Sequence, residues 1–311
     1  MIIPIYWLLL VLFTSFVILH IWHLPLRGAG HAPYDIFGTI GFIYMKIEYL
    51  VMRLANKFVM GAWSWFFRSR LKRFIFDTAR LAAVNYRAIS LEPYTIEESK
   101  AIVKNIFRRN KTKVLVANRI CPCRAATNKI TNGNGGLYDD KPIVTDIMFL
   151  TKPNLAILRS KPVKGFMRFI TIPDVLKSLD RFEEAGLVHA FMGPCDAIYG
   201  TVMMTICNCH PDICIPLAWH KKRNFSFFAE GHNIAVIDSA KCTGCGHCVT
   251  RCPVRARKLV NGKSVVLQHC FGCGTCRVTC EGHATHMVAT KHKPHYFPEY
   301  MIRHKDGTAL S

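Results

Sequence analysis

The sequence has few acidic residues and lacks the short motifs that bind nucleotides or haem. Asp and Glu together number 20 against 41 Lys and Arg, so the formal net charge is +21. Neither G-x-G-x-x-G nor G-x-x-x-x-G-K-[ST] occurs, which leaves no recognisable site for a dinucleotide or a P-loop phosphate. The haem-attachment motif C-x-x-C-H is also absent. Redox chemistry in this chain must therefore use another kind of centre or a partner protein.

The composition is that of a folded protein with metal-binding cysteines. Of the 311 residues, 50% are apolar and 20% are charged, which excludes wholesale disorder and collagen-like or mucin-like repeats. The length suits one or two domains. The 14 cysteines are too few for a dense disulfide scaffold in so long a chain, and most gather in C-x-C and C-x-x-C clusters. The cysteine pattern therefore indicates metal chemistry.

The N-terminus is a long apolar run. No formal charge interrupts it from Ile2 to Trp22, and about 20 apolar residues are what a helix needs to cross a bilayer. A cleaved signal peptide is the alternative, but no Lys or Arg precedes the run and it is longer than a typical h-region. Basic residues follow it, from Arg27 to Arg73. Residues 1–26 are therefore predicted to be a single-pass anchor in the cytoplasmic membrane, with the bulk of the chain in the cytoplasm.

Residues 27–76 form an amphipathic, membrane-proximal segment. Lys46, Arg53, Lys57 and Ser64 fall within an arc of about 40° on a 3.6-residue helix, with aromatic residues beside them. Such a helix can lie in the membrane interface and bind anionic head groups. Alternatively, it packs on the soluble domain and its basic face is solvated. The sequence leaves both interpretations open.

Two helices are predicted in the next segment from their start signals. Thr95 followed by Glu98 is a capping-box pattern that predicts a helix to about Arg109. A second helix is predicted to begin at Thr171 and to stop at Gly186.

Two strands are predicted to lead into pairs of cysteines. Residues 113–117 and 201–206 have β-rich sequences. The paired cysteines that follow are Cys121 and Cys123 after the first strand, and Cys207 and Cys209 after the second. We therefore expect residues 77–232 to form a small α/β domain with a site at one edge of its sheet.

The most specific pattern lies between Cys242 and Cys280, where the spacing C-x2-C-x2-C-x3-C occurs twice. Each [4Fe-4S] cubane needs four thiolates, and in this motif the fourth Cys of each run ligates the cluster of the other run. One predicted ligand set is Cys242, Cys245, Cys248 and Cys280. The other predicted set is Cys270, Cys273, Cys276 and Cys252.

The residues between the two runs predict a hairpin that folds one run back on the other. Residues 258–260 and 263–266 flank Asn261-Gly262, the pair preferred in a two-residue type I′ turn. Zinc knuckles are the alternative to cubanes, but the usual zinc sites are built from C-x2-4-C pairs. Residues 234–290 closely resemble bacterial-type 2[4Fe-4S] dicluster ferredoxins. The resemblance implies a ferredoxin-like domain over residues 233–290 that transfers single electrons through two cubanes.

Six cysteines lie outside these runs: Cys121, Cys123, Cys195, Cys207, Cys209 and Cys214. The elements Cys-Pro-Cys-Arg and Cys-Asn-Cys, with the residues up to the ferredoxin unit, resemble a widespread and poorly characterised group of 4Fe-4S dicluster proteins over about residues 110–290. Asp139 and Asp146 stand where that group has further cysteines, which puts its metal site in doubt here.

The surviving cysteines still supply enough ligands for a third centre. Cys121, Cys123, Cys207 and Cys209 provide four thiolates, which suit an iron-sulphur cluster or zinc. Cys214 or His210 are alternates. The other interpretation is a group of buried or reactive thiols, since free Cys is often buried. Cys195 has no close cysteine neighbour and is the poorest ligand candidate.

The expected fold class is α+β, with a transmembrane helix, a small α/β domain, a ferredoxin-like dicluster domain and a basic tail over residues 291–311. The expected function is membrane-anchored electron transfer, by a carrier or oxidoreductase subunit rather than a free-standing enzyme. The positive charge favours an acidic redox protein as partner, and the anchor favours a membrane oxidoreductase. An iron-sulphur reductase with a third metal or substrate site at the C-x-C pairs is the alternative. Nucleic-acid binding is disfavoured because no recognition motif is present.

Overall fold

The computed structural model describes residues 91–110, 114–127, 144–151, 167–192, 203–223, 226, 228–229 and 231–293, with residues 50, 53–54, 56–57 and 60–61. Among these residues, no helix combines the length and the apolar character needed to cross a bilayer. The predicted anchor over 1–26, most of segment 27–76, Asp139, Cys195 and the tail beyond residue 293 lie outside the described residues.

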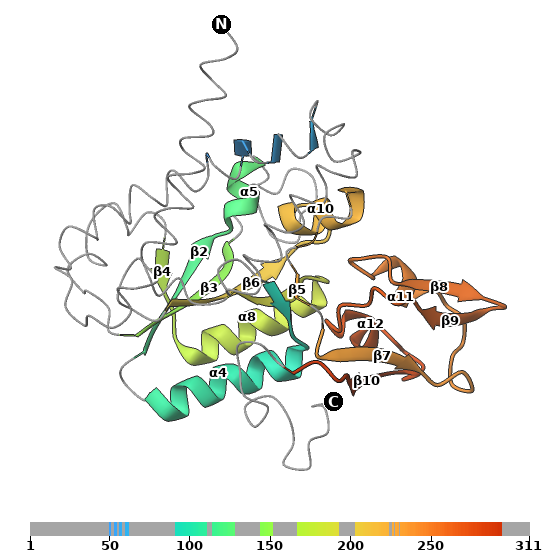
Figure 1. Ribbon diagram of the computed structural model, residues 1–311. Helices are drawn as coiled ribbons and strands as arrows, with labels where there is room; N and C mark the ends of the chain where they lie inside the picture. The colour runs from blue at the N-terminus through green and yellow to red at the C-terminus, as the bar shows by residue number, and fades with distance from the viewer. Residues whose placement is uncertain are drawn as a thin grey trace, which may run out of the picture.

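The α/β domain is built on a six-stranded sheet with the strand order β1-β5-β6-β3-β2-β4. Its strands are β1 (Leu91–Pro93), β2 (Val114–Ile120), β3 (Val144–Thr151), β4 (Met167–Phe169), β5 (Val188–Met192) and β6 (Met203–Cys209). Its helices are α4 (Ile96–Asn110), α5 (Pro122–Ala126), α8 (Ile172–Glu184) and α10 (Ile215–Arg223). Helices α4 and α8 lie on one side of the sheet, and α5 and α10 lie on the other (Figure 1).

Strands β2 and β6 end at the same edge of the sheet. Both pair antiparallel with β3, which lies between them, so they run in the same direction. Cys121 directly follows β2, and Cys209 is the last residue of β6. The expectation that the two C-x-C pairs come from strand ends is confirmed, although β6 extends further than predicted and includes Cys207.

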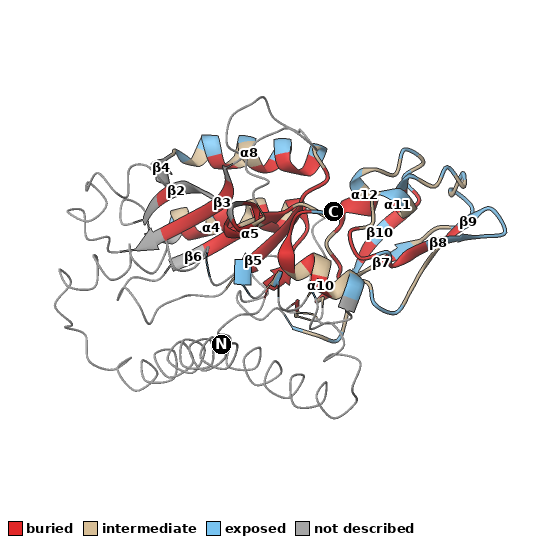
Figure 2. Ribbon diagram, turned by 90° about the horizontal axis from the view of Figure 1, so that it is seen from above, coloured by how far each residue is buried: buried red, intermediate tan, exposed pale blue. Residues whose placement is uncertain are grey.

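The two faces of the sheet bury different side chains. Successive residues of a strand point to opposite faces. Ile206 belongs to the core with α4 and α8, whereas Cys209 belongs to the core with α5 and α10, against which Cys207 packs. Figure 2 shows the buried residues concentrated in the sheet, while the tip of the C-terminal hairpin is exposed. The alternation therefore gathers the cysteines of β6 on one face.

Both predicted helix starts are capping boxes. At α4 the Thr95 backbone N–H donates to Glu98 Oε2 at 3.0 Å, and the Glu98 N–H donates to Thr95 Oγ1 at 3.2 Å. At α8 the same reciprocal bonds join Thr171 and Asp174 at 2.9 and 3.4 Å. Each box satisfies two backbone donors that a helix start otherwise leaves without a partner.

The C-terminal unit pairs two short strand ladders with two short helices. Its elements are β7 (Asn233–Ile237), α11 (His247–Thr250), β8 (Arg257–Val260), β9 (Lys263–Val266), α12 (Thr275–Val278) and β10 (Thr285–Ala289). β7 pairs with β10 and β8 pairs with β9. The predicted hairpin is confirmed, because Asn261 and Gly262 have φ angles of 50° and 71°, as a type I′ turn requires.

A buried polar cluster joins the two units at the start of α4. Glu98 Oε1 lies 3.1 Å from His232 Nε2 and accepts from Asn233 Nδ2 at 2.7 Å. Glu92 Oε1 lies 3.4 Å from His232 Nδ1. Burial alone would lower the pKa of His232, but hydrogen bonds and charges of the two glutamates raise it to about 9. His232 is therefore charged at neutral pH, with Nε2 hydrogen-bonded to the Glu98 carboxylate and Nδ1 at ion-pair distance from Glu92.

We predict that replacing Gly244 destabilises the first cysteine loop more than replacing Gly246. Both have positive φ angles, 75° and 79°, so Ala costs about 1 kcal/mol at either position. At Gly244 an added Cβ would lie 2.2 Å from the Gly262 carbonyl oxygen, whereas at Gly246 the nearest atom is 3.7 Å away. Thermal unfolding should show a clearly larger loss for Gly244→Ala than for Gly246→Ala. Equal losses would contradict the close approach.

We also predict a pH-dependent stability that depends on His232. Its ordinary pKa of 6.5 is raised to about 9 in the folded chain, so its contribution is fully present below pH 6.5 and is lost as pH rises through 9. The linked free energy is at most about 3 kcal/mol. The midpoint temperature of thermal unfolding should decrease as the pH rises from 6.5 to about 9.5. In His232→Gln this pH dependence should be weaker. The exposed His269→Gln is the control, and an unchanged slope in His232→Gln would refute the linkage.

Candidate metal centres

The first predicted ligand set lines one pocket of the C-terminal unit. Cys242, Cys245, Cys248 and Cys280 all border it. The first three belong to the first cysteine run and Cys280 ends the second run, so the fold brings together the cross-paired set that the spacing predicts. The pocket lies between the loop that begins at Cys242 and the residues that lead into β10.

Hydrogen bonds surround the sulphurs of this pocket. The Ser264 backbone N–H points to Cys242 Sγ at 3.5 Å, and the Ala284 N–H donates to Cys280 Sγ at 3.2 Å. The backbone N–H groups of Ser264 and Gly244, with smaller help from the positive charge of Lys263, lower the pKa of Cys242. These donors favour the thiolate form that a metal needs as its ligand.

The second predicted set gathers where the C-terminal unit meets the α/β domain. Cys252 interacts electrostatically with Cys270 and Cys273, and Cys276 interacts with Cys270 and Cys252. The Ala256 N–H donates to Cys252 Sγ at 3.1 Å, which repeats the bond made to Cys280. Burial raises the pKa of Cys276 to about 12. The second set is therefore less accessible to water than the first, in which Cys245 is exposed.

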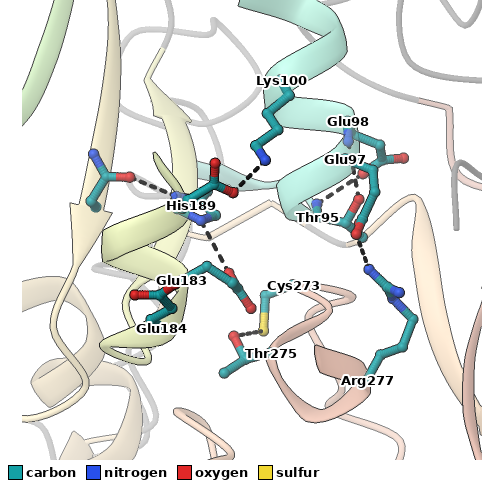
Figure 3. A network of polar contacts seen from close by, with 12 residues as sticks. Thr95, Glu97, Glu98, Lys100, Glu183, Glu184, His189, Cys273, Thr275 and Arg277 are labelled. Atoms are coloured by element: carbon teal, nitrogen blue, oxygen red, sulfur yellow. Dashed lines mark hydrogen bonds and ion pairs between the residues drawn. The ribbon is translucent and has the colours of Figure 1, made fainter. Parts of the chain in front are cut away.

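The start of α4 supports the second cysteine loop. Figure 3 shows Thr95 and Glu97 facing α12, with Arg277 reaching the Glu97 carboxylate. A Cβ on Gly274 would lie 3.0 Å from Thr95 Cγ2, so the loop and the helix start are in close contact. On the other side of the unit, Arg251 donates to the backbone carbonyls of Glu183 and Glu184 at 3.1 and 3.4 Å. The two units are thus linked at both cysteine runs.

The C-x-C pairs meet on the face of the sheet covered by α5 and α10. Sulphur contacts join Cys121 to Cys123, Cys123 to Cys214, and Cys214 to Cys209. Cys207 lies close enough to Cys209 to affect its ionisation. Burial raises the pKa of Cys214 well above its ordinary value.

The structure separates the two alternates that the sequence proposed for this site. Cys214 takes part in the chain of sulphur contacts. His210 instead shapes the turn before Cys214: its Nδ1 accepts the Asp212 N–H at 3.1 Å, and its carbonyl accepts the Cys214 N–H at 3.0 Å.

Sequence reasoning missed the role of two buried polar residues near these cysteines. Arg124 has 1% of its surface exposed, although it follows Cys123 directly. Asn208 lies between Cys207 and Cys209, and its side chain donates to the Thr145 carbonyl at 2.5 Å and contacts His189 Nδ1 at 2.6 Å. The sequence contained a signal in both cases, because Arg124 belongs to the Cys-Pro-Cys-Arg element and Asn208 to the Cys-Asn-Cys element. Asp146, noted in the sequence, is fully buried and raises the pKa of Cys121 as a lesser cause beside the Cys123 contact and burial.

None of the 13 described cysteines forms a disulfide. In the described part of the chain, no three His, Cys, Asp or Glu side chains are arranged to hold a single metal ion.

Comparison with known proteins identifies the C-terminal unit. Residues 234–281 match the family described as the 4Fe-4S dicluster domain. Ferredoxin-2 of Desulfomicrobium norvegicum is 57% identical over 30 residues, which are 10% of this chain and 51% of that ferredoxin. This chain thus spans about half the length of that relative, and no solved structure matches it. The cofactors are [4Fe-4S] clusters, and residues 234–281 form a 4Fe-4S dicluster domain of the kind that transfers electrons.

Proposed function

We propose that this chain relays single electrons between redox partners through two [4Fe-4S] clusters. The first cluster is held by Cys242, Cys245, Cys248 and Cys280. The second is held by Cys270, Cys273, Cys276 and Cys252. The observation that carries the proposal is the pocket bordered by three cysteines of the first run and the last cysteine of the second, because only a dicluster motif requires this exchange.

The two ligand sets have different surroundings, which gives the two clusters different positions in the relay. Cys245 is exposed, so a soluble partner can approach the first cluster. Cys273 lies near the start of α4 (Figure 3) and packs against the apolar core of the α/β domain. Cys248 of the first set interacts electrostatically with Cys276 of the second, which places the sets side by side. Electrons pass from the exposed cluster to the buried one, or in reverse.

Single serine substitutions test the ligand sets. Cys245→Ser should remove the first cluster and Cys273→Ser the second, because each cubane needs four thiolates. Each variant should lose about four irons per chain relative to the parent and one of two coupled S = 1/2 EPR signals after anaerobic reduction. Cys195→Ser is the matched control and should keep the parent iron content. Retention of both signals in either cluster variant would refute the assignment.

We further propose that the chain is held at the cytoplasmic membrane with its bulk in the cytoplasm, close to a membrane oxidoreductase. The support is the uncharged run from Ile2 to Trp22 and the basic residues after it. Where the membrane-proximal segment is described, Asn56 accepts from Trp219 Nε1 at 3.1 Å. Leu50, Leu54, Arg53 and Lys57 are exposed. One side of this helix therefore packs on α10, and another remains available for lipid.

We propose an acidic redox protein as the soluble partner. Residues 231–293 contain nine Lys and Arg against two Asp and Glu. Lys241 precedes Cys242 directly, Lys263 bonds to the Cys242 carbonyl, and Lys241, Arg255, Lys258 and Lys263 are all exposed. Such a surface attracts an acidic protein and speeds its association, and salt weakens the attraction.

High salt distinguishes the proposed membrane anchor from the proposed electrostatic contact with an acidic partner in one experiment. The full chain on anionic vesicles should stay bound in 1 M NaCl, since apolar burial holds the anchor, while reduction by an acidic flavodoxin slows at least tenfold. Lys258→Glu should slow reduction at low salt, and the exposed Lys177→Glu on α8 should not. Release from vesicles in salt would refute the anchor, and a salt-independent rate would refute the acidic partner.

A further inference from the structure

Three elements far apart in the sequence bring cysteines to one buried face. Strand β6 contributes Cys207 and Cys209, the start of α5 contributes Cys123, and the residue before α10 is Cys214. Cys123, Cys209 and Cys214 are buried, with exposed fractions of 9%, 6% and 4%, whereas Cys121 and Cys207 are partly buried. Because β2 and β6 run in the same direction, Cys121 after β2 joins the same group.

The four sulphurs of this group form a continuous chain of contacts. Cys121 contacts Cys123, Cys123 contacts Cys214, and Cys214 contacts Cys209. None of them forms a disulfide. Two converging C-x-C elements and a fifth cysteine on one wall supply the soft thiolate ligands that iron-sulphur clusters use.

A buried cation provides an independent sign that something negative belongs here. Arg124 is 1% exposed and is the largest fully buried side chain among the described residues. Its two terminal nitrogens find no hydrogen-bond partner within the part of the chain that the structure describes. Burying a guanidinium whose terminal nitrogens lack hydrogen-bond partners is destabilising. Asp146 shares this region beside Cys121, yet the Arg124 nitrogens make no hydrogen bond to it.

We propose that Cys121, Cys123, Cys209 and Cys214 hold a third [4Fe-4S] cluster, with Arg124 compensating its negative charge. A cubane with four thiolates is an anion in both of its common oxidation states, so it supplies the partner that the Arg124 guanidinium lacks. Cys207 lies beside the site, close enough to Cys209 to affect its ionisation. Zinc takes the same four thiolates, so metal analysis must distinguish the two.

The third cluster would extend the proposed relay. The apolar core around Cys123, Cys209 and Cys214 is the same core against which Cys252, Cys270 and Cys273 of the second cluster pack. Phe271, between Cys270 and Cys273, stacks on Phe228 with ring centroids 4.8 Å apart and lies 4.7 Å from His220 of α10. One electron then leaves the reduced second cluster and reduces the third, with no bond broken. This extension rests on the proposed function, whereas the site itself does not.

Metal analysis of the anaerobically purified full chain tests the site. The parent should contain about twelve irons and no zinc, and both Cys209→Ser and Cys214→Ser should contain about eight. Cys245→Ser should also lose about four irons, and the loss should add to that of Cys209→Ser because the sites are separate. A parent with about eight irons, or with zinc lost in Cys209→Ser, would overturn the third cluster. If only the relay proposal fails, the iron content per chain should be unchanged in Cys245→Ser but should still fall in Cys209→Ser.

Redox titration tests the part played by Arg124. Reduction adds negative charge to the cluster, so Arg124→Gln should lower the midpoint potential of the signal that Cys209→Ser removes. Arg124→Lys should restore most of the potential, because it keeps the charge, and both variants should keep the parent iron content. An unchanged potential in Arg124→Gln, or loss of the third cluster in Arg124→Lys, would overturn this role.

Discussion

The Glu98 carboxylate is the interaction on which the arrangement of the two units depends. One of its oxygens completes the capping box of α4, and the other meets His232 and Asn233 at the entry to the dicluster domain. The Asn233 carbonyl in turn approaches Gly272 so closely that a Cβ added there would lie 2.1 Å from its oxygen. A single buried carboxylate thus ties a helix start to the loop between Cys270 and Cys273. Because His232 is charged at neutral pH, the contact between the two units is a buried ion pair. Removing only one of its partners is strongly destabilising, because the other charge is left buried without a partner.

The six-stranded sheet decides which sulphurs share an environment. Its period of two sends Ile206 to the core with α4 and α8, and sends Cys207 and Cys209 to the opposite face. On that face one apolar cluster includes residues of both the α/β domain and the dicluster domain. Cysteines therefore occur from the exposed Cys245, through the partly buried second set, to the wall of the α/β domain. This order is the one that the proposed electron relay requires.

Much of the local structure was predictable because its causes are local. The capping boxes at Thr95 and Thr171, and the Asn261-Gly262 turn, depend on residues within a few positions of one another. The two cysteine runs predicted their exchanged pairing for the same reason, since the spacing limits which sulphurs reach one cluster. Strand β6 ends three residues later than predicted, because its last residues alternate cysteine with Asn208, whose side chain bonds to Thr145 and His189 on neighbouring strands.

The sequence by itself determined the charge, the cofactor class and the cysteine spacing, which are properties of composition and of neighbours along the chain. Only the tertiary structure decided that Cys214 rather than His210 joins the C-x-C sulphurs, and that the terminal nitrogens of Arg124 are buried without a hydrogen-bond partner among the described residues. It also decided that His232 lies between two glutamates. These outcomes depend on contacts between elements up to about 140 positions apart, which arise when strands pair and helices cover them, so no pattern along the chain predicts them.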